Sequence, residues 1–125
     1  MGTNPLRGEA DLVAGDQTYK LVFDVNAFIC AEQALGGMTT DEIVERYERT
    51  QAKADMTLLR ALVYGGLQRE HPCHLIQAGE IVADAGIASV RDAVRTGLGA
   101  AFGMKPAEDK EEPDPPVAPD ETGTG

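Results

Sequence analysis

Apolar and polar residues alternate near the start of this chain, as they do in a β-strand with one buried face. Tyr19, Leu21 and Phe23 fall on one side of such a strand. Leu12, in a preceding run of strand-forming residues, can join that side from a partner strand. Between the two runs, Gly15-Asp16 is a two-residue hairpin turn of the Gly-X type. The pattern predicts a β-hairpin, and because a lone hairpin is marginally stable in water, we expect it to pack against helices.

Beyond the hairpin, apolar residues recur every three or four positions, which is the spacing of one helix face. Asp24 is a favourable N-cap, and Thr39 with Glu42 has the spacing of a capping box. Pro72 and Gly86 mark helix ends. The predicted helices cover residues 25–35, Asp41–Arg49, Asp55–Glu70, Leu75–Ala85 and Ile87–Phe102.

Two adjacent glycines, Gly65 and Gly66, interrupt the apolar stripe of the third predicted helix. Each costs the helix about 1 kcal/mol relative to alanine. Their presence predicts that another stretch of backbone approaches the helix closely at this point.

The composition changes after Phe102. Residues 103–125 hold seven carboxylates against two lysines, together with five of the seven prolines. Such a segment buries too little apolar surface to offset the entropy of ordering it. We therefore predict an α+β fold with a single domain over residues 1–102, in which a two-stranded hairpin packs on a bundle of about five short helices, followed by a disordered acidic tail over residues 103–125.

The formal charge of −10 narrows the possible partners. It argues against binding to nucleic acid, which requires clustered Lys and Arg, and against binding to an anionic membrane. The only cysteines are Cys30 and Cys73, and we find no signal peptide and no apolar run of the ~18 residues that span a bilayer. We expect a cytosolic protein.

The segment Glu70–His74, EHPCH, is the one cluster of reactive side chains. His71, Cys73 and His74 could supply three zinc ligands, but the chain has no further histidine to complete a site. Pro72 also restricts how the three could converge. We interpret the segment as a turn in which Pro72 ends one helix and His74 precedes the next. For Cys73 to act as a nucleophile, it would need a third group to orient its histidine partner, and the sequence indicates none. A small metal-dependent module that uses His71, Cys73 and His74 remains an alternative function.

The remaining charged and glycine-rich segments do not indicate catalysis. Asp41, Glu42, Glu45 and Glu48 read as the solvated face of a short helix, and no glycine-rich segment has the strand–loop–helix context of a phosphate site. We expect a protein that is not an enzyme and that uses no cofactor or metal.

Several longer stretches together resemble one family. The chain opens with NPLRGEADLVAGDQTYKLVFDVNAFICAEQALG and continues with TTDEIVER, LLRALVYGGLQREHP and AGEIVADAG before the proline-rich acidic tail. This order is similar to that of the small tail proteins of gene transfer agents and related long-tailed phages, which are described both as tail tube proteins and as tail assembly chaperones. The resemblance covers roughly residues 4–102 and departs from the family pattern at Cys73-His74.

The resemblance implies a chaperone in the cytoplasm of a bacterial host cell. Such a protein coats the tape-measure protein, a long helical chain, and helps to recruit tail tube subunits. A structural subunit of the tail tube is the alternative, although the chain offers only two short strands for a ring. We predict that the partner surface involves the exposed parts of the second and third helices and the hairpin edge. Tyr47 and Tyr64 are the proposed contacts, because they are the aromatic residues that the core least obviously needs.

Overall fold

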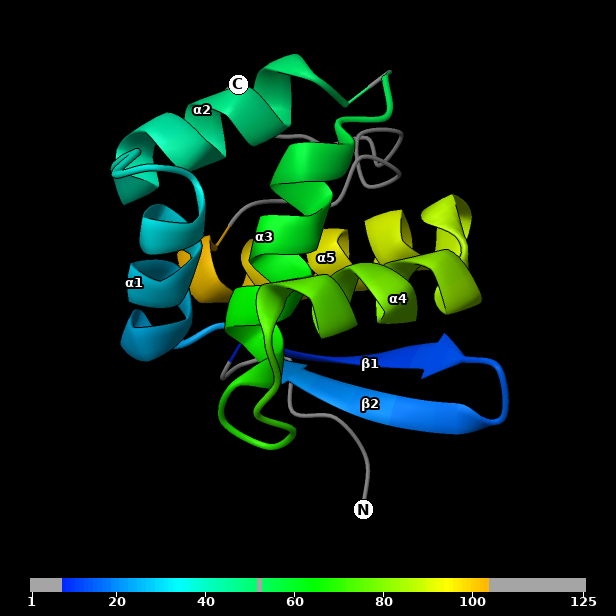
Figure 1. Ribbon diagram of the computed structural model, residues 1–125. Coiled ribbons are helices and arrows are strands. Elements are labelled where there is room, and N and C mark those ends of the chain that lie inside the picture. The colour runs from blue at the N-terminus through cyan, green and yellow to red at the C-terminus, as the bar shows by residue number, and fades with distance from the viewer. Residues whose placement is uncertain (1–7, 52, 104–125) are drawn as a thin grey trace, which may run out of the picture.

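The computed structural model describes residues 8–51 and 53–103, which form an α+β fold with one hairpin and five helices (Figure 1). The acidic tail predicted for residues 103–125 lies outside the described residues, apart from Gly103. No helix in the described ranges is both long and apolar enough to cross a membrane. The elements are β1 (Glu9–Ala14), β2 (Gln17–Val22), α1 (Val25–Ala34), α2 (Thr40–Arg49), α3 (Met56–Leu67), α4 (Leu75–Ala85) and α5 (Ile87–Phe102).

The hairpin forms as predicted. β1 pairs with β2 in antiparallel fashion, with Leu12 opposite Tyr19, and Gly15 adopts a φ of 65° in the turn. Leu12, Leu21 and Phe23 are buried and Tyr19 is half-buried, so the predicted inner face is the face that meets the helices. In Figure 1 the hairpin lies below α3, α4 and α5, α1 packs along the side of α3, and α2 lies at the end of α3 that is away from the hairpin.

Helix α3 is the centre of the fold, since it contacts α1, α4, α5 and β2. A Cβ added at Gly65 would lie 2.3 Å from the carbonyl oxygen of Ala27 in α1. A Cβ at the adjacent Gly66 would lie 3.1 Å from the Cβ of Leu21 in β2. The prediction of a close backbone approach is therefore confirmed, and the neighbouring backbone is that of α1.

The helix starts follow the capping residues. Asp24 accepts a hydrogen bond from the Ala27 amide at 2.8 Å at the start of α1. At the start of α2, Thr39 Oγ1 accepts from the Glu42 amide at 3.2 Å, and the Glu42 carboxylate accepts from the Thr39 amide at 2.9 Å. The predicted capping box is present, and it satisfies amide groups that a helix N-terminus otherwise leaves without partners.

The sequence predicts that the third helix ends at Glu70, whereas α3 ends at Leu67. At this end, Gln68 Nε2 donates to the carbonyl oxygens of Tyr64 at 2.9 Å and Cys73 at 3.1 Å. The Cys73 bond ties the turn after the helix to its last residues. The steric effect of Pro72 then keeps His71 out of helical geometry.

Candidate functional site

His71, the first histidine of EHPCH, joins the loop after α3 to the hairpin. Its Nε2 accepts a hydrogen bond from the Lys20 backbone amide at 3.2 Å. Its ring lies edge-on to the ring of Tyr19, with centroids 5.1 Å apart. The sequence separates Lys20 from His71 by 51 positions, so this bond fixes the loop against β2.

Cys73 and His74 have separate surroundings. Cys73 is half-buried, and burial raises the pKa of its thiol above the usual value, although a hydrogen bond from Gln68 opposes the shift. A raised pKa leaves less of the nucleophilic thiolate at neutral pH. His74 is exposed, and its backbone amide donates to Gln77 Oε1 at 2.8 Å, so it precedes α4 as expected.

The side chains of EHPCH do not assemble a metal site with their neighbours. Within the described ranges, no group of three or more His, Cys, Asp or Glu residues is placed to hold a metal ion. The contacts of His71, Gln68 and Gln77 instead account for the segment as a turn that links α3, α4 and β2.

Tyr47 is part of the core, so the prediction that the core does not need it is wrong. Its side chain is 8% exposed and belongs to the core cluster, and burial raises the pKa of its hydroxyl. Tyr64 is half-buried and packs against the same core from α3. Periodicity placed Tyr47 on the apolar side of its helix, but only the tertiary packing reveals how completely that side is covered. A role of either residue in partner binding stays a prediction.

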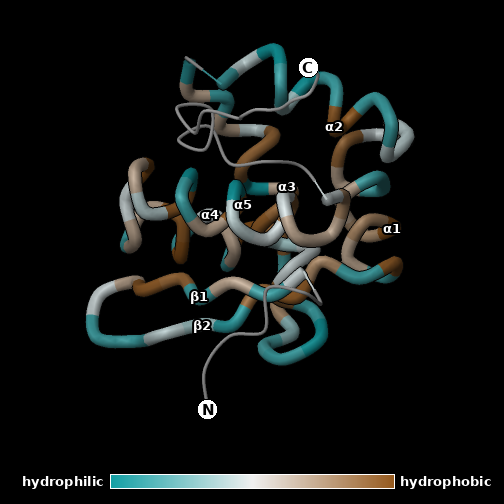
Figure 2. The backbone as a smooth tube through the Cα atoms, turned by 180° about the vertical axis from the view of Figure 1, so that it is seen from behind, coloured by the Kyte–Doolittle hydropathy of each residue, from teal (hydrophilic) through white to brown (hydrophobic). Residues whose placement is uncertain are grey.

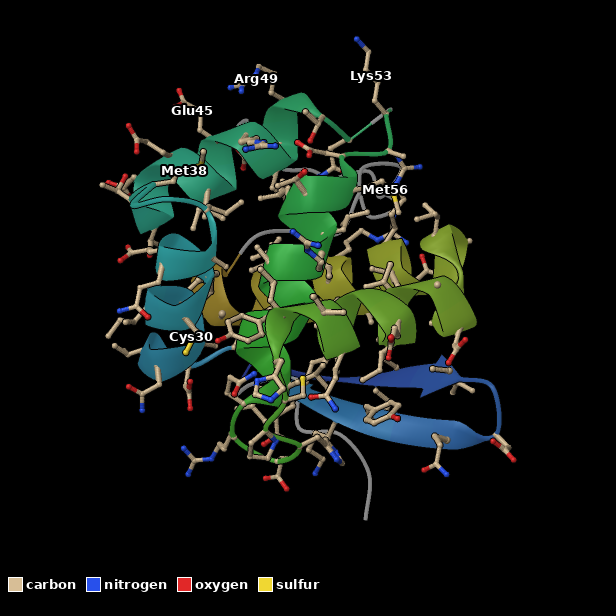
Figure 3. The ribbon with its side chains drawn as sticks, viewed as in Figure 1. Cys30, Met38, Glu45, Arg49, Lys53 and Met56 are labelled. Carbon is tan, nitrogen blue, oxygen red and sulfur yellow. The ribbon has the colours of Figure 1, made fainter. Side chains whose placement is uncertain are left out.

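The carboxylates of α2 lie on its solvated side, as predicted. Asp41, Glu42, Glu45 and Glu48 are all exposed. Figure 3 shows Glu45 and Arg49 projecting from α2 away from the body of the molecule. Neighbouring charges on such a face are screened by water, as the interpretation of a solvated face expects.

An exposed apolar surface lies on α1, where the sequence analysis did not place a site. Of the six exposed large apolar side chains among the described residues, Val25, Ile29 and Phe102 account for three, with exposed fractions of 74%, 44% and 42%. Val25, Phe28 and Ile29 share one side of α1, because residues three and four apart are neighbours on a helix. Phe28 stacks edge-on with Phe102 of α5 at a centroid distance of 5.1 Å.

We call these four residues the α1 face: Val25, Phe28, Ile29 and Phe102. Figure 2, seen from behind, shows hydrophobic segments on the outer side of α1. The sequence carried a signal for this surface, since Val25 and Ile29 are apolar residues outside the stripe that the helix turns toward the core.

Comparison with known proteins assigns this chain to no family. No family model, curated protein or solved structure matches the chain.

Proposed function

We propose that this protein is a phage-like tail assembly chaperone that binds the tape-measure protein and assists tail tube assembly in a gene transfer agent or prophage. The observation that carries the proposal is the α1 face. Val25, Ile29 and Phe102 are exposed, and half-buried Phe28 contacts Phe102 between the two helices. Exposed apolar side chains that gather in this way on a small, acidic protein mark an interaction surface. An amphipathic helix can bury its own apolar stripe against such a surface through residues spaced three and four apart.

The charge of the chain fits a partner that must be kept from aggregating. At −10, copies of the chain repel one another, which disfavours association of bound complexes. The same charge favours partner segments whose polar side carries Lys and Arg. Support for the tape-measure protein as the partner comes from the sequence resemblance described above.

The test is co-expression with the tape-measure protein encoded among the neighbouring tail genes, followed by affinity capture. A Val25→Ser/Ile29→Ser double variant removes apolar surface from the α1 face without emptying the core, because both side chains are exposed. We expect capture to fall by about tenfold or more, given ~1 kcal/mol or more for each buried aliphatic side chain. The control is Ile76→Ser on α4, which changes an isoleucine on another helix that is 72% exposed, about as much as Val25 at 74%.

Retention of capture by the double variant, or an equal loss in the Ile76→Ser control, would contradict this placement of the interface. A structural tail tube subunit remains the alternative function, and a metal-dependent module built on His71, Cys73 and His74 is a second alternative. Stoichiometric presence in mature particles would support the tube subunit, and tight stoichiometric zinc binding by the purified protein would support the metal module.

A further inference from the structure

The outer edge of β1 presents backbone groups that the hairpin does not use. The Phe23 amide donates to the Gly8 carbonyl at 2.9 Å, which fixes the alternation of the ladder. In an antiparallel pair, every second residue turns its N–H and C=O toward the partner strand and the others turn them away. The register therefore directs the N–H and C=O of Asp11 and Val13 away from β2.

These outward groups have no hydrogen-bond partner within the described part of the chain. Both side chains are exposed, Val13 by 56%. An edge strand with free N–H and C=O groups is a template for a further strand.

A groove runs beside this edge, and its other wall is α5. It has a volume of about 380 Å³, which lies within the range of small binding sites. β1 and α5 contact each other, and both lie on the near side of the molecule in Figure 2. The groove is lined by Ala10, Asp11, Val13, Ser89, Asp92, Ala93 and Thr96.

The charged residues beside the groove favour a bound segment with a basic side chain. Lys20, which lies opposite Asp11 in the ladder, is directed to Glu9 at 3.7 Å. Asp11 has no ion pair within the described residues, whereas Asp92 is bound by Arg95. A basic side chain on an added strand would therefore meet an unpaired carboxylate at Asp11.

A second copy of this chain is a poor occupant. When two β1 strands pair through their outward groups around Asp11, the two Asp11 side chains lie directly opposite or diagonally adjacent. Like charges in these positions destabilise a sheet, and each copy also carries a formal charge of −10.

We infer that the outer edge of β1 binds an extended segment of a different polypeptide as a third, antiparallel strand, through the backbone of Asp11 and Val13. Asp11 and Val13 share one face of the strand, so the bound segment presents a basic residue opposite Asp11 and an apolar residue opposite Val13. In antiparallel orientation the segment reads apolar–any–basic from N to C. The middle residue faces the side of Ala93 and the hydroxyl-bearing Ser89 and Thr96, which favours a small or hydroxyl side chain.

This strand-addition site goes beyond the proposed function, because it adds a second surface and a different binding mode from helix docking on the α1 face. It does not depend on the identity of the partner. The probe is therefore a synthetic peptide, acetyl-Thr-Val-Thr-Lys-Thr-amide, and its control is the same peptide with Glu in place of Lys.

The experiment is an NMR titration of the full ¹⁵N-labelled chain with each peptide at low salt, followed by amide hydrogen exchange. We expect the lysine peptide to shift and protect the amides of Asp11 and Val13 and to bind about tenfold more tightly than the glutamate peptide. Val13→Pro removes the outward N–H without touching the β1–β2 ladder and should abolish binding. The matched control Thr18→Pro removes an outward N–H from the opposite edge, because Thr18 pairs with Val13, and should leave binding unchanged.

Asp11→Lys provides a second variant with no proline, and it should reverse the preference between the two peptides. Equal binding of the two peptides, perturbations that map away from β1, or unaltered binding by Val13→Pro would each overturn the inference. The Val25→Ser/Ile29→Ser variant should still bind the lysine peptide. If that variant loses capture of the tape-measure protein but keeps peptide binding, the two surfaces are independent. If wild-type protein captures no tape-measure protein but binds the peptide as expected, the proposed function fails and the strand-addition site stands.

Discussion

The packing of α1 against α3 gives the most quantitative prediction. In Gly65→Ala, the new Cβ would lie 2.3 Å from the Ala27 carbonyl oxygen and 3.1 Å from its carbonyl carbon. Ordinary contact begins near 3.4 Å, so the two helices would have to separate locally by about 1.1 Å, which is 3.4 minus 2.3. The obstacle is backbone, and it cannot rotate away as a side chain could.

Two opposing effects set the size of the change. Alanine gains about 1 kcal/mol over glycine in a helix interior, whereas overpacking a tight core costs about 1–3 kcal/mol, at the upper end when backbone must move. We expect a net loss of about 2 kcal/mol in the free energy of unfolding. For a domain of this size that is a fall in Tm of about 10 °C.

The matched control is Gly79→Ala in α4, where the new Cβ would meet only the Arg60 side chain, with its Cδ nearest at 3.2 Å. The Cγ of the same side chain lies at 3.9 Å, which is ordinary contact. That flexible side chain can shift, so the helix-propensity gain of up to ~1 kcal/mol should dominate and raise Tm by a few degrees. Urea unfolding followed by circular dichroism at 222 nm measures both variants. Equal stability of Gly65→Ala and wild type, or equal losses in the two variants, would refute the close approach of α1 and α3.

Three further predictions concern individual side chains. His71→Ala should lower the free energy of unfolding by about 1–2 kcal/mol, because the Lys20 amide of β2 loses its acceptor. His74→Ala should change it very little. Urea unfolding measures both variants, and equal losses would contradict the distinct roles of the two histidines. The Arg46 guanidinium, which binds the Asp55 carboxylate at 2.6 and 2.8 Å, holds the pKa of Asp55 below its usual value. That stabilisation is complete above the usual aspartate pKa of ~3.9 and is lost as the pH falls through the lowered pKa of Asp55. The difference in Tm between wild type and Asp55→Asn should therefore shrink below about pH 4. A difference in Tm that does not change with pH would argue against the ion pair. Burial raises the pKa of Cys73, so iodoacetamide should alkylate it more slowly in the folded protein than in urea at the same pH, as peptide mass spectrometry would measure; equal rates would contradict its burial.

Local chemistry explains why much of the fold is predictable from the sequence. The turn at Gly15, the caps at Asp24 and Thr39 and the close approach at Gly65 each depend on one residue type with one conformational or steric property. These properties act over a few residues or one contact, so the sequence states them directly.

The rest depends on individual side-chain bonds and on contacts between distant segments. At the end of α3, the Gln68 side chain bonds to Cys73, and periodicity does not encode that bond. The sequence does not reveal that the core needs Tyr47, because the burial of this side chain arises only when α2 packs against the core. The exposure of Val25 and Ile29 likewise follows from which side of α1 faces α3, and an apolar helix with two candidate sides leaves that choice to the tertiary structure.

We propose that this chain holds another polypeptide during assembly. Quantitative mass spectrometry can follow the chain, first in complexes purified with the tape-measure protein before tail tubes form, and then in finished particles. For a chaperone we expect a fixed ratio to the tape-measure protein in the early complexes and loss of the chain from finished particles. A ratio in finished particles equal to that of a tube subunit, or absence from the early complexes, would contradict it.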